Sequence, residues 1–313
     1  MHRAPAKRVL FIGSKELGLC SLREVFAISP GTLVGVLTID DTGDSRSKLG
    51  DIRQFAQENR LALHVATGKR HVEEIIRTTG PDLCIVVGWY LLFGKKTLEQ
   101  VPWGFVGIHN SLLPKYRGCS PLVWAILNEE REVGISLFTL TEQMDEGPVW
   151  GQKRVTVGAV DYMGDIVPKL EQKTSELLQE CYPGILSGAL QPTPQDHSLA
   201  TYCAQRTPED GVVDWGNRMS YVYNFIRALG HPFPGAFTFC GGEKIKILRA
   251  TPLSEVYFGA PGQVVRVMNT GVAVVCGDNR AIRIEEVEVA GNRLAASGYF
   301  RSSRARMTSP FRQ

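Results

Sequence analysis

The sequence predicts an α/β fold: an open, mostly parallel sheet in the first part of the chain, then a smaller β-rich domain. Up to about residue 160, short β-rich runs alternate with helical stretches, which is typical of βαβ units. Runs such as residues 9–13 and 83–89 are apolar throughout, as expected of parallel strands covered by helices on both faces. From residue 236 onward, short strands recur between turns, which is typical of a small barrel or sandwich.

The spacing of apolar residues places each element of the first part. Strands are expected at 9–13, 32–38, 63–66, 83–89 and 133–140, and helices at 17–27, 51–59 and 72–78. A longer helix is expected at 165–181, because Pro183 and Gly184 follow it and are typical of a helix end. A polar stretch with two prolines then predicts a linker at about 186–204, which divides the chain into a catalytic domain over 1–203 and a second domain over 204–313.

The second domain is expected to begin with one helix and continue with strands. The helix is expected at 221–229 and the strands at 236–240, 244–249, 262–267, 271–276 and 281–290. Gly241-Gly242 is typical of a two-residue hairpin turn. The basic, Ser-rich tail from Arg301 is expected to be mobile.

Composition excludes several classes of protein. The 313 residues fit two ordinary domains, and no apolar run approaches the roughly 18 residues of a membrane span. The basic start precedes only the short apolar run 9–13, which indicates a first strand rather than a signal peptide. Seven cysteines without a C-x-x-C spacing argue against a disulfide framework or a metal site and favour a reducing, cytoplasmic setting.

The charge is mild but uneven. The net charge is +3, and from residue 204 onward fourteen Lys and Arg face nine Asp and Glu, an excess of five. That excess permits an anionic partner without requiring one. Gly13-Ser14-Lys15-Glu16-Leu17-Gly18 opens the first helix but matches neither the dinucleotide nor the P-loop glycine pattern, so we interpret it as an ordinary tight turn.

His109 and Asp145 are the candidate catalytic pair. Each follows an apolar strand, and a His and an Asp at two strand ends can meet in the crevice beyond the sheet. A neutral imidazole accepts a proton near pH 7, and a carboxylate beside it fixes its tautomer. The alternatives are a structural histidine and a β-turn aspartate before Gly147. Gly88, Trp89 and Tyr90, at the end of the apolar strand 83–89, could border a flat heterocycle or simply pack in the core.

Several motifs together resemble those of enzymes that use 10-formyltetrahydrofolate. Residues 107–118 resemble the family signature His-x-Ser-Leu-Leu-Pro-x-x-Arg-Gly, and residues 144–147 resemble its Asp-x-Gly loop. The resemblance continues through 206–211, 214–215 and 232–237 and so covers nearly the whole chain. It is nearest to the formyltransferase domain that N-formylates UDP-4-amino-4-deoxy-L-arabinose, and methionyl-tRNA formyltransferases share the two-domain plan.

The resemblance implies a Rossmann-like catalytic domain, an OB-like C-terminal barrel and 10-formyltetrahydrofolate as co-substrate. It implies that His109 is the general acid or base and Asp145 its partner. The folate-contacting positions fall on Gly88, Trp89 and Tyr90, and on the loop of Thr141, Glu142, Gln143 and Met144.

One position departs from the family pattern. The family usually carries Asn two residues before the catalytic His, where the sequence has Gly107. Residues i and i+2 share a face of a strand, and a missing oxyanion donor typically costs about 10²–10³ in turnover. Asn110 is the expected substitute, provided that the strand ends at His109. Gly107 could instead leave room for a bulkier acceptor.

The expected activity is N-formylation of a primary amine, with a nucleotide-linked amino sugar as the favoured acceptor. Methionyl-tRNA is the less favoured acceptor, because residues 40–48 are not basic where the tRNA enzymes resemble one another in a basic insert. Hydrolysis of 10-formyltetrahydrofolate is an alternative, since a related hydrolysing domain also lacks the Asn, and a non-catalytic ligand-binding protein is another. The oligomeric state is open, with a homodimer among the options.

Overall fold

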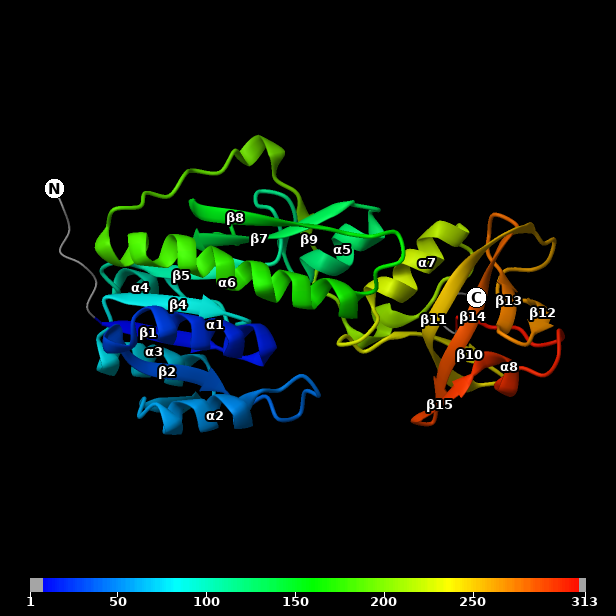
Figure 1. Ribbon diagram of the computed structural model, residues 1–313, viewed down its shortest axis with the longest axis horizontal. Coiled ribbons are helices and arrows are strands. Elements are labelled where there is room, and N and C mark those ends of the chain that lie inside the picture. The colour runs from blue at the N-terminus through cyan, green and yellow to red at the C-terminus, as the bar shows by residue number, and fades with distance from the viewer. Residues whose placement is uncertain (1–7, 310–313) are drawn as a thin grey trace. The chain divides into compact units, whose positions relative to one another are not determined.

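The computed structural model describes residues 8–309. The chain divides into two compact units, each built from three separate segments, and Figure 1 labels their helices and strands. The first comprises the chain up to Pro121 with Glu132–Thr156 and Pro168–Ala204, and the second comprises Leu122–Arg131, Val157–Val167 and the chain from Gln205 onward. The division into domains at residue 204, with a linker over 186–204, stays a prediction.

The first unit contains the seven-stranded sheet that the alternation predicted. Its order is β3-β2-β1-β4-β5-β7-β8. The pairs among β3, β2, β1, β4 and β5 are parallel, whereas β5–β7 and β7–β8 are antiparallel, so the sheet is mostly parallel. The strands are β1 (Val9–Gly13), β2 (Leu33–Ile39), β3 (Leu63–Ala66), β4 (Leu83–Val87), β5 (Phe105–His109), β7 (Glu132–Thr139) and β8 (Val149–Thr156).

Helices cover both faces of this sheet. The helices are α1 (Lys15–Ile28), α2 (Leu49–Glu58), α3 (Lys69–Thr79) and α4 (Lys95–Glu99), with a 3-10 turn η1 (Pro30–Thr32). Leu10 and Ile12 of β1 share a core cluster with Val72 and Ile76 of α3. Because alternate strand residues face opposite sides and all of β1 is buried, the second face is covered too.

Helix α6 (Met163–Ser187) corrects one expectation. The predicted helix ended before Pro183, but the helix continues to Ser187 with Pro168 and Pro183 inside it. A proline removes one backbone hydrogen bond from a helix. Tyr182 and Ile185 on either side of Pro183 are buried, so packing holds the helix together where the local signal predicts its end.

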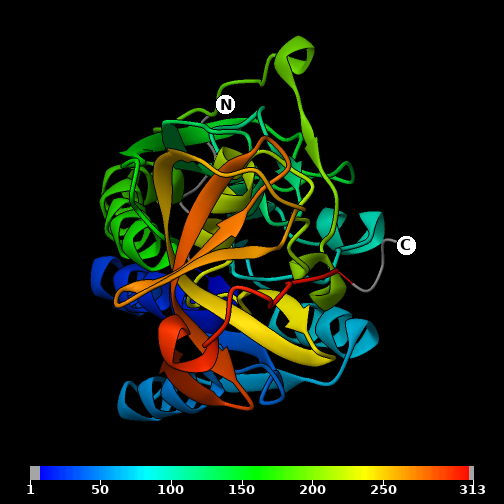
Figure 2. The same cartoon turned by 90° about the vertical axis from the view of Figure 1, so that its right-hand side faces the viewer.

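The second unit is built on an antiparallel sheet of order β10-β11-β14-β13-β12, with β15 paired to β14 (Figure 2). The predicted hairpin is confirmed, because Cys240 pairs with Glu243 across Gly241 and Gly242, both with positive φ. The elements are α5 (Pro121–Leu127), α7 (Met219–Ala228), β10 (Ala236–Cys240), β11 (Glu243–Val256), β12 (Val264–Met268), β13 (Gly271–Val275), β14 (Arg280–Val289), β15 (Asn292–Ala295) and α8 (Ala296–Tyr299).

The tail from Arg301, which we expected to be mobile, is held in place where the structure describes it. Thr308 pairs with Phe239 of β10, and Arg306 pairs with Gln263 beside β12. Met307 between them is 1% exposed. The segment therefore contacts strands at both edges of the sheet, as expected of a barrel-like domain. The Arg- and Ser-rich composition wrongly predicted mobility, because one buried methionine anchors the segment. Residues 310–313 lie outside the described part.

Short elements complete the described chain. They are β6 (Arg117–Gly118), β9 (Tyr202–Cys203), which pairs with it, and the 3-10 turns η2 (His197–Leu199) and η3 (Pro208–Gly211). Among residues 8–309, no helix combines the length and the apolar character that crossing a bilayer demands.

Candidate active site

His109 is the last residue of β5, and its ring lies between two oxygen atoms. Nε2 lies 2.7 Å from the carbonyl oxygen of Tyr116, and Nδ1 lies 3.6 Å from Oδ2 of Asp145. The carbonyl can only accept, so Nε2 carries a hydrogen and donates it. Nδ1 is therefore the ring position that can take up and release a proton, and it faces the carboxylate.

The two residues meet for a different reason from the one that the sequence suggested. β5 and β7 are antiparallel, so the end of β7 lies beside Val106, at the opposite end of β5 from His109. The residues after β7 instead turn back along β5: Leu140 bonds to the backbone of Phe105, and Asp145 reaches His109. We expected the two residues to meet in the crevice beyond the ends of their strands; Asp145 instead reaches His109 from a loop that turns back along β5, and their proximity is observed.

Asp145 is held in an uncommon backbone conformation. Its φ is +54°, a left-handed value that Asp adopts more readily than most residues. Its Oδ2 accepts a 2.7 Å hydrogen bond from the N–H of Gly118. Gly147 completes the turn, because a Cβ there would lie 1.7 Å from the carbonyl oxygen of Thr139. The N–H of Gly118 thus holds the carboxylate, and Gly147 allows the backbone to turn directly after Glu146.

The loop that follows His109 is pinned to β7 and β8. Ser136 of β7 accepts from the N–H of Leu113 at 3.0 Å and donates to the carbonyl of Ser111 at 2.7 Å. Gln152 of β8 donates to the carbonyl of Leu113 at 2.8 Å. These bonds keep the loop, and with it the Tyr116 carbonyl, in a fixed place against the His109 ring.

Gly107 leaves no space for a bulkier acceptor. A Cβ on Gly107 would lie 2.3 Å from Cδ1 of Leu140 and 3.4 Å from Cε1 of Phe138. The side chain of Leu140 therefore occupies the place where the family usually carries the Asn. That expectation of an enlarged pocket at Gly107 is wrong, because the loop that brings Asp145 to His109 also lays Leu140 over the glycine.

We expected Asn110 to replace the family Asn only if the strand ends at His109, and β5 does end there. Within residues 8–309 its Oδ1 is buried and has no hydrogen-bond partner. A carboxamide that the protein does not hold by its oxygen can rotate to present either its oxygen or its NH₂ group. Its role as a substitute donor stays a prediction.

The end of β4 differs in length from the expectation. The strand ends at Val87 rather than at residue 89, because Gly88 has φ +63° and a Cβ there would lie 2.4 Å from the carbonyl oxygen of Ser14. Trp89 and Tyr90 then stack, with ring centroids 6.2 Å apart. Trp89 packs against the core, but its buried Nε1 has no partner in the described chain, whereas Tyr90 is 58% exposed.

The loop before Asp145 is exposed. Thr141 donates from Oγ1 to the carbonyl of Gln143 at 3.1 Å, and Glu142 and Met144 are exposed beside them. These residues therefore lie at the protein surface, directly before Asp145 in the chain. Among residues 8–309, no cluster of three or more His, Cys, Asp or Glu side chains has the arrangement of a metal site.

Sequence reasoning missed two residues that connect this site. Arg117 is fully buried, and Gln195 bonds both to its guanidinium and to the carbonyls of Asp145 and Gly147. Arg117 is the Arg of the family signature in residues 107–118, so the sequence could have identified it as a site residue. Gln195 lies in the stretch that we assigned to a linker, where composition carries no sign of a buried side chain.

Comparisons with known proteins show the family of the chain. The formyl transferase model matches residues 29–183, and the model of the formyl transferase C-terminal domain matches residues 206–304. The chain belongs to the formyl transferase family. The methionyl-tRNA formyltransferase of Halalkalibacterium halodurans is 30% identical over 308 residues, 96% of each chain, and that of Myxococcus xanthus is 31% identical over 89% of each.

Several solved structures share the fold. The sugar 3N-formyltransferase WlaRD superposes with a TM-score of 0.67 at 16% identity, over 91% of this chain and 98% of that one. HypX from Aquifex aeolicus gives 0.64 at 20% identity, over 93% of this chain and 46% of that one. The predicted fold class and the predicted 10-formyltetrahydrofolate-dependent formyltransferase family are confirmed, and with them the enzyme class.

Proposed function

We propose that this formyltransferase moves the formyl group of 10-formyltetrahydrofolate to a primary amine at the His109–Asp145 pair. The observation that carries the proposal is the 3.6 Å approach of Asp145 Oδ2 to Nδ1 of a His109 ring whose Nε2 already donates to Tyr116. The free electron pair of the amine attacks the formyl carbon, the bond from that carbon to N10 breaks, and a proton passes from the amine to N10. His109 carries that proton on Nδ1, and Asp145 orients the ring.

We assign the formyl donor to the surface that borders this pair. Tyr90 is exposed and stacks with Trp89 next to Gly88, and this flat surface suits a heterocycle. The loop of Thr141, Glu142, Gln143 and Met144 is exposed, and we assign its main-chain groups as further donors and acceptors for the ligand. The exposed fractions of the side chains of His109 and Asp145 are 11% and 21%, so bound ligands would leave little water at the reacting atoms.

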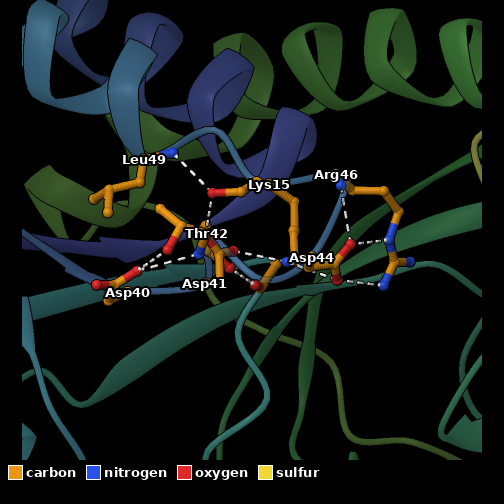
Figure 3. A network of polar contacts seen from close by, with 10 residues as sticks. Lys15, Asp40, Asp41, Thr42, Asp44, Arg46 and Leu49 are labelled. Carbon is orange, nitrogen blue, oxygen red and sulfur yellow. Dashed lines mark hydrogen bonds and ion pairs between the residues drawn. The ribbon is translucent and has the colours of Figure 1, made fainter.

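The favoured acceptor is the amine of a nucleotide-linked amino sugar, and the loop after β2 supports a small acceptor over tRNA. Its cation Arg46 is paired with Asp44 at 2.8 Å, and the loop also holds Lys15 of α1, which contacts Asp41 at 2.7 Å and Asp44 at 2.9 Å (Figure 3). Tight tRNA binding depends on Lys and Arg that neutralise phosphates. A loop whose cations are neutralised by its own carboxylates is a poor phosphate-binding surface.

Methionyl-tRNA is the second candidate acceptor, and the relatives favour it. Both relatives described above are methionyl-tRNA formyltransferases and match the chain over nearly its full length. The excess of five cations after residue 203 also fits an anionic partner.

A formyl-transfer assay separates these candidates. The purified chain is incubated with 10-formyltetrahydrofolate and either a panel of nucleotide amino sugars or charged initiator methionyl-tRNA. We expect turnover with an amino sugar, at a rate that changes little between 50 and 200 mM salt. Turnover with the tRNA alone would reject the amino-sugar proposal, and formate release without any amine would instead identify a hydrolase.

His109→Ala is the control that tests the chemistry. We expect it to abolish formyl transfer, and an unchanged rate would favour a non-catalytic ligand-binding protein that retains the fold. All seven cysteines are free thiols, which supports a location in the reducing cytoplasm. Light scattering of the purified protein tests whether it forms a homodimer.

A further inference from the structure

Arg117 is a buried cation that connects the two loops of the candidate site. Its guanidinium is fully buried, and its Nη1 lies 3.2 Å from Oε1 of Glu146, the residue after Asp145. Burying a guanidinium costs free energy unless it is paired and hydrogen-bonded. Glu146 supplies the opposite charge, so the charge of Arg117 attracts the loop that carries Asp145.

Gln195 completes the connection through hydrogen bonds. Its Oε1 accepts from Nε and Nη2 of Arg117 at 3.2 and 2.7 Å. Its Nε2 donates to the carbonyl oxygens of Asp145 at 2.8 Å and Gly147 at 2.7 Å. Two donors and two accepted bonds use the whole hydrogen-bonding capacity of the carboxamide. No water or ligand is needed to explain its orientation.

The residue after Arg117 makes the third contact. The N–H of Gly118 donates to Oδ2 of Asp145, the same oxygen that faces Nδ1 of His109. Asp145 is thus held by its backbone carbonyl from Gln195 and by its carboxylate from Gly118. Its left-handed φ of +54° is stabilised by these contacts rather than by a helix or a strand.

We propose that Gln195 and Arg117 are positioning residues that hold Asp145 against His109, with Glu146 as the counter-ion of Arg117. The inference rests on the proposed function only in assigning the chemistry to His109 and Asp145. Neither residue touches the reacting atoms. Their effect on turnover passes through the orientation of the Asp145 carboxylate.

Gln195→Glu is the most direct test, because it removes the donor group of this side chain and keeps the acceptor. The new carboxylate still accepts from Arg117, but it has no N–H to donate to the carbonyls of Asp145 and Gly147. We expect kcat to fall roughly 10- to 100-fold, with the KM for 10-formyltetrahydrofolate changed less than about twofold. Gln191→Glu is the matched control, since Gln191 is exposed and bonds only to the carbonyl of Gly188, and we expect its kcat to equal that of the wild type.

A double-mutant cycle with Asp145→Asn distinguishes positioning from a general loss of structure. If Gln195 acts through Asp145, adding Gln195→Glu to Asp145→Asn lowers kcat by less than about twofold. A fall of 10- to 100-fold in that background, as independent effects would give, overturns the proposal. Gln195→Met removes both the donor and the acceptor of this side chain, and it is the second variant should Gln195→Glu fail to fold.

Crystal structures of the wild type and Gln195→Glu test the positions without any assay. We expect the Asp145 carboxylate to leave its place beside Nδ1 of His109 in the variant, and an unmoved carboxylate overturns the proposal. If the wild type turns over no formyl donor, the proposed function fails, while these two structures still decide whether Gln195 positions Asp145.

Discussion

Leu140 and Gly107 allow a direct test of how the site compensates for the missing family Asn. A Cβ on Gly107 would lie 2.3 Å from Cδ1 of Leu140, so Gly107→Asn alone overpacks the site. We expect a loss of about 1–3 kcal/mol in the free energy of unfolding. Leu140→Ala alone removes a partly buried side chain and leaves a gap, at a cost of about 2 kcal/mol.

The double variant should recover part of both losses. In Gly107→Asn/Leu140→Ala the new carboxamide enters the space that Leu140 leaves, on the same face of β5 as His109. We expect it to be about 1–2 kcal/mol more stable than the sum of the single effects predicts, well beyond the roughly 0.5 kcal/mol scatter of independent sites. Chemical denaturation of the four proteins measures this coupling.

Single-turnover formyl transfer is the functional measurement for the same four proteins. If the restored carboxamide reaches the developing oxyanion, the double variant should be roughly 10- to 100-fold faster than Leu140→Ala. Leu140→Met serves as the matched control, because it keeps a side chain of similar volume in the place that the Asn would need. Additive stabilities with unchanged rates would refute the reasoning that Leu140 stands in the place of the Asn.

Three further predictions test individual groups. Asn110→Ala should lower turnover roughly tenfold or more if its amide replaces the missing donor, and an unchanged rate in steady-state kinetics would reject that role. Burial, with the charges of Cys119 and Asp145, raises the pKa of the Cys203 thiol to about 11. At pH 8 its alkylation by iodoacetamide, followed by mass spectrometry, should therefore be at least tenfold slower than that of an ordinary thiol, and equal rates would contradict this. The hydrogen bond from Arg46, with a smaller one from Lys15, holds the pKa of Asp44 below its usual range, so its carboxylate stabilises the fold above about pH 4 and less as the pH falls. Asp44→Asn should therefore lower the melting temperature at pH 7 more than at pH 3, and an equal shift at both would count against the ion pairs.

The sequence predicted the elements best where burial alone determines them. The apolar runs of β1 and β4 indicate strands covered on both faces, and Gly241-Gly242 has the positive φ values of a hairpin turn. The errors arose where a local signal competed with packing. Pro183 predicted a helix end, and the basic tail predicted mobility, yet buried neighbours hold both segments in place.

The candidate site shows the same limit. His109 and Asp145 were found from their positions after apolar strands, but the antiparallel direction of β7 could not be inferred from the pattern of the strand itself. Gln195 was missed because a buried glutamine in a polar, proline-containing stretch has no periodic signature. Its role depends on carbonyl groups of the backbone, which every residue carries and no sequence pattern distinguishes.

The contacts of His109 narrow the origin of oxyanion stabilisation. Nε2 donates to the Tyr116 carbonyl, so in the proposed mechanism Nδ1, which lies beside Asp145, carries the transferred proton. A ring nitrogen that gives its proton to the leaving nitrogen cannot stabilise an oxyanion at the same moment. With Leu140 in the place of the family Asn, the proposed mechanism takes its oxyanion donor from another residue, and Asn110 is the neighbouring carboxamide whose oxygen no described residue holds. The Asn110→Ala and Gly107→Asn/Leu140→Ala variants therefore both test whether Asn110 supplies the oxyanion donor that the family usually has at residue 107. If it does, the rate of formyl transfer should fall in the first variant and rise in the second.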